Sequence, residues 1–182
     1  MIDTLYGPVA ATVVTKATAL QLLICDIDGV FSDGRVYMGN AGEELKAFHT
    51  RDGFGVKALL NAGIEVAVIT GRQSQIVANR MQGLGVKHIY QGQDNKLVAF
   101  EQLIDRLNLT PEQVGYIGDD VIDLPVMTCC GLSVAVADAH PLVRNQADYC
   151  TRINGGFGAV RELADLILQA KGLLAQAQGT SI

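Results

Sequence analysis

Short apolar runs recur along this chain, and segments with helical spacing lie between most of them. The runs that predict β-strands span residues 20–27, 64–70, 86–90, 114–120 and 132–138, with a short sixth at 148–151. Between them, apolar residues three and four positions apart predict helices over 52–63, 73–85, 96–108 and 124–131. Apolar strands that alternate with helices are typical of a parallel sheet buried on both faces. The pattern therefore predicts a doubly wound, Rossmann-like α/β fold with helices on both faces.

The two ends of the chain extend this pattern without adding a second domain. A short helix is predicted over 8–20, with Pro8 near its start, where a missing N–H is tolerated. A last helix is predicted over 159–171, since its apolar residues fall on one face. The small and polar tail, 172–182, is expected to be mobile. A chain of 182 residues is expected to form one domain, 1–182.

One segment, 35–50, breaks the alternation of strands and helices. Two short strands around the sequence GNAG predict a β-hairpin with that sequence as its turn. The hairpin is either a surface flap or, as we favour, a projecting ribbon that pairs with another subunit. Its apolar residues need a surface to bury against: Val36, Tyr37, Met38, Leu45 and Phe48.

Composition and charge narrow the classes of function. The net charge of -5 argues against a nucleic-acid binder, although local cations can still bind a small anion. No apolar run approaches about 20 residues and no signal-peptide layout is present, so we expect no membrane span and a cytoplasmic protein. The four cysteines match no zinc or C-x-x-C spacing and are expected to be reduced core residues.

Polar residues follow four of the predicted strands, at or just after the point where each strand ends. Because the carboxyl ends of parallel strands meet at one edge of a sheet, we expect these side chains to lie close together. In chain order they are Asp26 and Asp28, then Thr70, Gly71 and Arg72, then Lys96, and finally Asp119, Asp120 and Asp123.

This edge has the chemistry of a phosphoryl-transfer site. Crowded carboxylates repel one another unless a cation lies among them, and Mg²⁺ prefers carboxylate and phosphate oxygens. Thr70, Lys96 and the amides around Gly29 and Gly71 can donate to a phosphate. The carboxylates of Asp26 and Asp28 cannot be equivalent, since one residue separates them. One can attack phosphorus and form an aspartyl phosphate, while the other protonates the leaving oxygen.

The sequences DIDGV, ITGR, a later lysine and GDDVID, in this order, resemble the four motifs of the haloacid dehalogenase superfamily of phosphatases. The resemblance implies that Asp26 is the nucleophile and Asp28 the acid/base. It also implies that Thr70 and Lys96 bind the phosphate. By the same resemblance, Mg²⁺ would be held by Asp26, the main-chain carbonyl of Asp28, and Asp119, and oriented indirectly by Asp120 and Asp123.

Longer sequences, among them YMGNAGEELKAFHTRDGFG, GLSVAVADAHP and GGFGAVRE, extend the resemblance over nearly the whole chain. They are similar to the phosphatases that hydrolyse 3-deoxy-D-manno-octulosonate 8-phosphate in lipopolysaccharide synthesis, a family that is capless, magnesium-dependent and tetrameric. The spacings 28–70 and 70–96 likewise leave no room for a cap domain. The resemblance implies that neighbouring subunits close the site through the hairpin and the tail. It further implies that the sugar acid contacts His49, Thr50, Arg51, Asp52, Gly53, Arg72 and Arg80.

Other interpretations stay open. The same motifs would serve a phosphatase for another sugar acid phosphate, such as a nonulosonate phosphate. A receiver-like signalling module also gathers aspartates, Thr and Lys, but its paired acids come first along the chain. A non-enzymatic binding module would not need Asp28. Among single residues, Asp33 fits a turn, Asp52 fits a helix N-cap almost as well as a substrate contact, and Arg80 would ordinarily be a solvated side chain.

Overall fold

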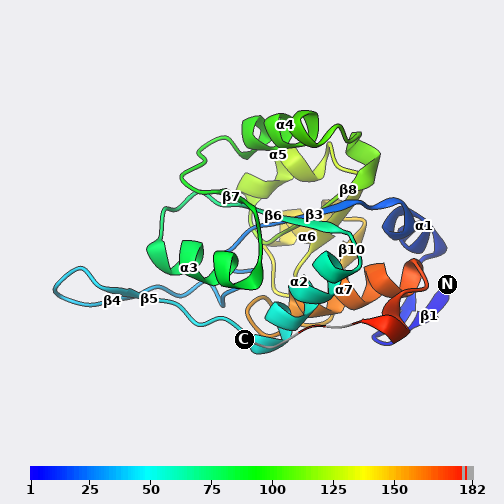
Figure 1. The fold of residues 1–182 in the computed structure, drawn as a ribbon, viewed down its shortest axis with the longest axis horizontal. Helices are drawn as coiled ribbons and strands as arrows, with labels where there is room; N and C mark the ends of the chain where they lie inside the picture. The colour runs from blue at the N-terminus through cyan, green and yellow to red at the C-terminus, as the bar shows by residue number, and fades with distance from the viewer. Residues whose placement is uncertain (178, 180–182) are drawn as a thin grey trace.

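A six-stranded parallel sheet forms the centre of the molecule (Figure 1). The computed structural model describes residues 1–177 and 179. In spatial order the strands are β10 (Tyr149–Cys150), β9 (Leu132–Ala135), β8 (Val114–Gly118), β3 (Leu22–Cys25), β6 (Glu65–Ile69) and β7 (His88–Tyr90). β3 pairs with β6 on one side and β8 on the other, so the chain order reverses at β3. Ligands of such sheets bind beyond the carboxyl ends of the strands at this reversal.

Helices cover both faces of the sheet. In Figure 1, α2 and α7 pack together below it, α1 packs against α7 at the right-hand end, and α4 and α5 lie above it. All of β3 is buried between these layers, as its apolar sequence requires. The predicted doubly wound α/β fold is therefore confirmed. The α-helices are α1 (Ala11–Ala19), α2 (Thr50–Asn61), α3 (Gln75–Leu84), α4 (Lys96–Leu107), α5 (Leu124–Met127), α6 (Pro141–Gln146) and α7 (Ala159–Ala170).

Two helical segments differ from the prediction. An antiparallel hairpin of β1 (Ile2–Thr4) and β2 (Gly7–Val9) precedes α1, so Pro8 lies in a strand and not in the helix. A two-stranded ribbon has free edges, where a residue without an N–H is tolerated. The segment predicted as a helix over 124–131 continues only to Met127 and follows a 3-10 turn, η2 (Val121–Asp123). A further 3-10 turn, η1 (Pro111–Gln113), precedes β8, and α6 was not predicted at all.

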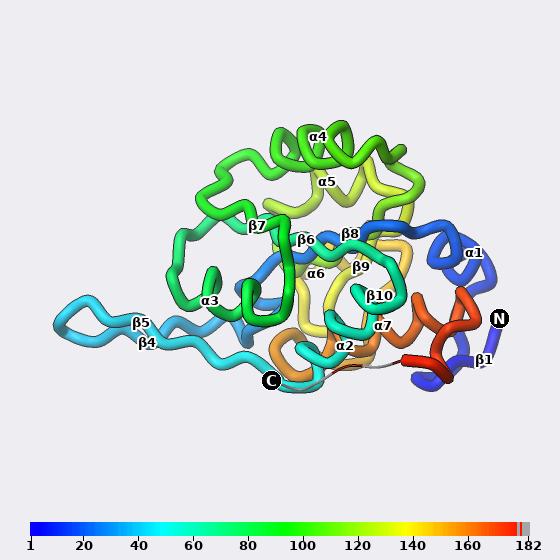
Figure 2. The backbone as a smooth tube through the Cα atoms, viewed as in Figure 1, coloured from blue at the N-terminus to red at the C-terminus, as the bar shows by residue number. Residues whose placement is uncertain are grey.

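The predicted hairpin forms and projects from the body of the molecule (Figure 2). Its strands β4 (Tyr37–Met38) and β5 (Glu44–Leu45) pair antiparallel, with Tyr37 opposite Leu45. Three apolar side chains of the hairpin remain in solvent: Tyr37 is 53%, Met38 75% and Leu45 64% exposed. From residue 28 to residue 96, the described elements are this hairpin, α2, β6, α3 and β7. The absence of a cap domain between these residues agrees with the predicted spacing.

The carboxyl-terminal tail begins as an ordered segment. Leu174–Gln176 form a 3-10 turn, η3, and Leu173 and Leu174 pack against the core. Residues 178 and 180–182 of the tail predicted to be mobile lie outside the described residues. Within the described part of the chain, no helix has the length and apolar character needed to cross a membrane.

A buried glutamate fixes the glycine-rich loop that leads into α7. Glu162 has no exposed surface and accepts hydrogen bonds from the Tyr149 hydroxyl at 2.6 Å and the Ile153 amide at 3.0 Å. Beyond these anchors, the loop contacts the turn that follows β3. The Gly156 amide donates to the Val30 carbonyl at 2.8 Å. This hydrogen bond therefore fixes the turn after β3, which carries Asp28, against the glycine-rich loop.

Gly155 occupies the closest approach between the loop and this turn. A Cβ atom at residue 155 would lie 1.6 Å from the carbonyl oxygen of Gly29. The Gly155 amide also donates to Asp138 Oδ1 at 2.9 Å, which restricts movement of the loop away from the turn. Any side chain at residue 155 would displace the backbone that follows β3.

We therefore expect Gly155→Ala to destabilise the protein by about 1–3 kcal/mol, the usual range for overpacking, and to lower any activity of the site. Thermal unfolding measures the first effect. Gly83→Ala is the matched control, since nothing lies within 4 Å of a Cβ atom there and Gly83 is within α3. That substitution should stabilise the helix by roughly 0.5–1 kcal/mol. Equal unfolding temperatures for the two variants would contradict the close approach at Gly155.

Candidate active site

The polar residues that follow the strands do meet at one edge of the sheet. A pocket of about 380 Å³ opens beyond the carboxyl ends of β3, β6 and β8. This juxtaposition, predicted from the strand ends alone, is therefore found in the structure. The residues that line the pocket include Asp26, Asp28, Thr70, Gly71, Arg72, Lys96, Asp119 and Asp120.

Asp26 lies directly beyond β3 and faces a buried lysine. Its amide donates to the Ile117 carbonyl at 3.0 Å, which extends the pairing of β3 with β8 by one residue. Lys96 Nζ lies 2.8 Å from Asp26 Oδ1, and both side chains are almost fully buried. Lys96 is the first residue of α4, and Asn95 caps this helix by accepting from the Leu97 amide at 3.2 Å. The helix start thereby delivers the ammonium group to the end of β3.

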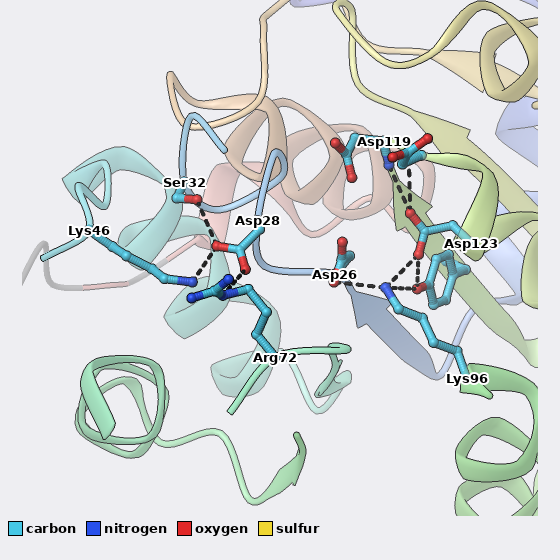
Figure 3. A network of polar contacts seen from close by, with 10 residues as sticks. Asp26, Asp28, Ser32, Lys46, Arg72, Lys96, Asp119 and Asp123 are labelled. Carbon is cyan, nitrogen blue, oxygen red and sulfur yellow. Dashed lines mark hydrogen bonds and ion pairs between the residues drawn. The ribbon is translucent and has the colours of Figure 1, made fainter. Parts of the chain in front are cut away.

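Asp123 organises the surroundings of Lys96 and of the turn after β8 (Figure 3). Its Oδ1 atom lies 2.7 Å from Lys96 Nζ and accepts from the Tyr116 hydroxyl at 2.6 Å. Its Oδ2 atom accepts from the amides of Asp119 at 3.0 Å and Asp120 at 3.2 Å. A carboxylate with four donors is well suited to orient its neighbours, which is the indirect role predicted for Asp123. Tyr116 was missed from the sequence, although a phenol inside an otherwise apolar strand indicates a buried partner.

The carboxylates of this cluster carry more negative charge than Lys96 offsets. Burial raises the pKa of Asp26 to about 6, although Lys96 opposes the shift. Burial and the neighbouring carboxylates of Asp26 and Asp123 raise the pKa of Asp119 to about 8. The Asp119 side chain fits there because Gly29 has no Cβ, which would lie 2.1 Å from Asp119 Oδ2.

The same cluster fits a hard divalent cation. One oxygen each of Asp26, Asp119 and Asp123 lies within 4.8 Å of the others. Because Asp123 already accepts from several donors, Asp26 and Asp119 are the carboxylates best placed to bind an ion. A cation between them would remove the repulsion that raises the pKa of Asp119.

Asp28 points away from this cluster, as expected, but the one-residue spacing is not the cause: β3 ends at Cys25 and the chain turns at Ile27 and Asp28. In Figure 3 it lies on the side of Lys46 and Arg72. Lys46 Nζ forms an ion pair with Asp28 Oδ1, and Arg72 Nε lies 3.8 Å from Asp28 Oδ2. The Ser32 hydroxyl donates to Asp28 Oδ1 at 3.5 Å. Asp26 and Asp28 therefore have different partners and face different parts of the pocket.

Thr70 and Gly71 line the pocket immediately beyond β6. The Thr70 amide donates to the Tyr90 carbonyl at 2.9 Å, and the Thr70 carbonyl accepts from the Gln93 amide at 3.1 Å. The backbone of Thr70 is thus held by the strand and loop on its β7 side. Its place at the pocket agrees with the predicted phosphate contact, which stays a prediction.

Most residues predicted to contact the sugar acid lie elsewhere in a single chain. Arg72 lines the pocket, whereas His49, Thr50 and Arg51 lie at the start of α2. His49 is the N-cap of this helix, and its Nδ1 atom accepts from the Arg51 amide at 3.1 Å. The N-cap role considered for Asp52 is therefore wrong, because the helix begins at Thr50 and His49 caps it.

Asp52 instead joins two helices. Its side chain is 1% exposed, and Oδ1 accepts from the Arg161 amide at 2.8 Å in the first turn of α7. Burial raises the pKa of Asp52 to about 6, although amides at the start of α7, including that of Arg161, oppose the shift. A buried carboxylate at the start of α7 holds α2 against that helix. Its contact with a sugar stays a prediction that the geometry of one chain does not favour.

Arg80 lies against Gly53 and is not an ordinary solvated arginine. A Cβ atom at residue 53 would lie 2.6 Å from Arg80 Nη2, so the glycine leaves room for the end of the Arg80 side chain where α3 packs on α2. Burial lowers the pKa of Arg80, while the charge of Asp52 opposes the shift. The substrate contacts of Gly53 and Arg80 stay predictions.

Comparison with known proteins identifies the group to which this geometry belongs. Residues 86–163 match the model of the haloacid dehalogenase-like hydrolases. The 3-deoxy-D-manno-octulosonate 8-phosphate phosphatase of Escherichia coli (strain K12) is 59% identical over 179 residues, which cover 98% of this chain and 95% of that protein.

Solved structures agree with the sequence match. The 3-deoxy-D-manno-octulosonate 8-phosphate phosphatase of Yersinia pestis has a TM-score of 0.98 at 58% identity, covering 100% of this chain and 98% of that one. The corresponding phosphatase of Moraxella catarrhalis, in complex with magnesium ion, phosphate ion and a KDO molecule, has a TM-score of 0.89 at 40% identity. That alignment covers 90% of this chain and 94% of that chain.

These matches extend well beyond the residues that line the pocket. The alignment with the Escherichia coli protein includes 98% of the chain, and so reaches past the pocket into the hairpin and the last helix. Similarity of this extent excludes a receiver-like signalling module, which was one of the open alternatives. The chain belongs to the 3-deoxy-D-manno-octulosonate 8-phosphate phosphatase family of the haloacid dehalogenase-like hydrolases.

Proposed function

We propose that this protein hydrolyses 3-deoxy-D-manno-octulosonate 8-phosphate to the free sugar acid and phosphate in lipopolysaccharide precursor synthesis. The observation that carries the proposal is the contact of Asp26 with Lys96 beside Asp119, in a chain 59% identical to the Escherichia coli phosphatase. We also propose a cytoplasmic location, since all four cysteines are free thiols.

Asp26 is the proposed nucleophile. Its carboxylate attacks phosphorus, and an O–P bond forms as the bond from phosphorus to the sugar oxygen breaks. Lys96 Nζ, 2.8 Å from Asp26 Oδ1, orients this carboxylate and reduces its repulsion from the incoming phosphate. Asp123 fixes Lys96 in turn, at 2.7 Å. Thr70 and the amides near Gly29 and Gly71 are proposed to bind the phosphate oxygens.

Asp28 is the proposed acid and base. In its protonated form it donates its proton to the departing sugar oxygen. It then accepts a proton from the water that attacks phosphorus, and the bond between phosphorus and Asp26 breaks. The divergence of Asp26 and Asp28 in Figure 3 supports this division of labour.

Mg²⁺ is the proposed cofactor, because the cluster of Asp26, Asp119 and Asp123 has surplus negative charge and oxygen donors. Asp26, Asp119 and the main-chain carbonyl of Asp28 would hold it, with Asp120 and Asp123 as orienting residues. When bound, the ion supplies positive charge that stabilises the phosphate and the attacking carboxylate together.

A homotetramer is the proposed assembly. The exposed side chains of Tyr37, Met38 and Leu45 on the projecting hairpin offer an apolar contact surface. The pocket is also open in a single chain without a cap domain. Neighbouring subunits would close it, and the residues at the start of α2 would then approach a substrate from another chain.

Turnover of a panel of phosphates tests the proposed function. The panel contains 3-deoxy-D-manno-octulosonate 8-phosphate, a nonulosonate phosphate and simple phosphomonoesters, with released phosphate as the readout. We expect the first compound to have the highest kcat/KM, and Asp26→Asn to lose at least about 10³-fold in kcat because the nucleophile is gone. Asp94→Asn is the control, since Asp94 is outside the residues that line the pocket. A preference for the nonulosonate phosphate would show that this compound, and not 3-deoxy-D-manno-octulosonate 8-phosphate, is the substrate. Normal turnover by Asp26→Asn would exclude the covalent mechanism.

Stability should depend on pH and magnesium together. Because the pKa values of Asp26 and Asp119 are raised to about 6 and about 8, these two groups bind more protons in the folded chain than in the unfolded chain from about pH 4 to about pH 8. Without metal, the unfolding temperature should therefore fall as pH rises through this window. Magnesium replaces those protons, so the increase in unfolding temperature that it causes should be larger at pH 8 than at pH 5.5.

Thermal unfolding at several pH values, with chelator and with magnesium, measures how the unfolding temperature depends on pH in each case. Asp119→Asn should flatten the metal-free slope between about pH 6 and about pH 8 and weaken the effect of magnesium, because it removes the group with the higher pKa. A magnesium effect that is independent of pH would contradict this account of the cluster.

The tetramer is tested by substitution of one exposed leucine. Leu45→Lys should weaken assembly, since each buried copy would lose roughly 1.5–3 kcal/mol of apolar burial. Sedimentation velocity at several concentrations measures the change. Leu5→Lys is the matched control, because Leu5 is 68% exposed and lies outside the hairpin. A monomeric unaltered protein that is fully active would refute the assembly and its part in closing the site.

A further inference from the structure

The second arm of the hairpin, β5 and its continuation, carries two charged side chains that contact residues of the pocket: Lys46 contacts Asp28, and Glu44 lies beside Arg72. Because side chains alternate along a strand, Glu44 and Lys46 share one side of β5 and its continuation, while Leu45 faces the other. The environments differ accordingly. Leu45 is 64% exposed, whereas the side chain of Lys46 has 0% exposure. A completely buried ammonium group on a projecting ribbon requires nearby anions to balance its charge.

Those anions are Asp28 and Glu44. Lys46 Nζ forms an ion pair with Asp28 Oδ1 and lies 3.5 Å from Glu44 Oε1. Arg72 joins the same two carboxylates, at 3.8 Å from Asp28 Oδ2 and 3.7 Å from Glu44 Oε1. Glu44 Oε1 therefore lies within ion-pair distance of both cations that contact Asp28, although it accepts no hydrogen bond. Each oxygen of Asp28 faces a different cation, and the closer contact, with Lys46, restricts the carboxylate most.

Lys46 is placed to act on Asp28 and not on a phosphate. In the view of Figure 3, Asp28 lies between Lys46 and Asp26, so Lys46 approaches the carboxylate from the side away from the proposed nucleophile. Lys46 is also not among the residues that line the pocket. Arg72, by contrast, lines the pocket and is 51% exposed, so it can turn to a ligand. Lys46 is thus the fixed member of the pair.

We propose that Lys46 is a positioning residue that holds the Asp28 carboxyl in the orientation needed for proton transfer, with Glu44 holding Lys46. The proposal rests on the proposed function, in which Asp28 protonates the leaving sugar oxygen. The segment from Glu44 to Lys46 would then assist proton transfer, in addition to any contact with another subunit. Lys46 itself transfers no proton and makes no bond to substrate.

The leaving group separates this role from a structural one. A sugar alkoxide departs slowly without a proton, whereas nitrophenolate departs readily without one. A misplaced Asp28 should therefore slow the first step with a sugar phosphate and leave the first step with p-nitrophenyl phosphate nearly unchanged. Single-turnover reactions with excess enzyme isolate this step from the later hydrolysis of the aspartyl phosphate.

We expect Lys46→Met to slow release of the sugar acid by about 10–100-fold and release of nitrophenolate by less than about 3-fold, given that general acid catalysis contributes about 10²–10⁴-fold. Glu44→Gln should produce the same selective loss, but a smaller one. Lys87→Met is the matched control, because it removes the same charge from an exposed lysine before β7 and should change neither rate. Circular dichroism and unfolding temperature report whether each variant is folded.

The outcomes separate the two proposals. Equal losses with both substrates in folded Lys46→Met would overturn the positioning role, because Lys46 would then act on the phosphate or on the whole site. Unchanged rates with both would overturn it as well. If Lys46→Met does not fold, Glu44→Gln decides between the same outcomes. Failure of the proposed function would appear in the unaltered protein, as no turnover of the sugar acid phosphate. In that case Lys46→Met and the unaltered protein are compared on an alkyl phosphate that the unaltered protein does hydrolyse.

Discussion

The ion pairs of one buried lysine are the interaction on which the rest of this site depends. Lys96 lies between Asp26 at 2.8 Å and Asp123 at 2.7 Å, where burial lowers its pKa but the two carboxylates outweigh that effect and raise it. Removing Lys96 would leave two carboxylates buried without compensation, at a cost of about 3–5 kcal/mol. Three elements must therefore meet with little tolerance: the end of β3, the start of α4 and the turn after β8. The parallel sheet supplies this alignment, since its strands end at one edge.

The alignment of strand ends also explains why so much of the site is predictable from the sequence. Continuous apolar runs determine which segments are buried strands, and the residue after each run must then emerge at the common edge. Asp26, Thr70 and Asp119 are positioned by this rule alone. Their partners are harder to predict, because a hydrogen bond across the sheet depends on the order of strands and not on local sequence. Tyr116 is such a case, since its partner Asp123 lies beyond the strand in a 3-10 turn.

Where local sequence and packing compete, the prediction fails for a physical reason. Pro8 fits the first turn of a helix as well as an edge strand, and the pairing of β1 with β2 decides between them. Asp52 has the form of an N-cap, but the first turn of α7 offers it unpaired amides across the α2–α7 contact. Arg80 is mid-helix, yet its surroundings are set by Gly53 on another helix. In each case a contact distant in sequence outweighs a local preference.

A fold without a cap domain must obtain the other contacts around its pocket from segments that project from the body, such as the hairpin. The strand β5, which includes Leu45, can provide contacts on both of its faces. One face presents Lys46 to Asp28 with Glu44 beside it, and the other exposes Leu45 to solvent. Because a single residue of slippage would exchange these faces, the register of the hairpin matters for the site as well as for its surface. A ribbon of two short strands is marginal by itself, so contacts on its outer face would also restrain the residues on its inner face.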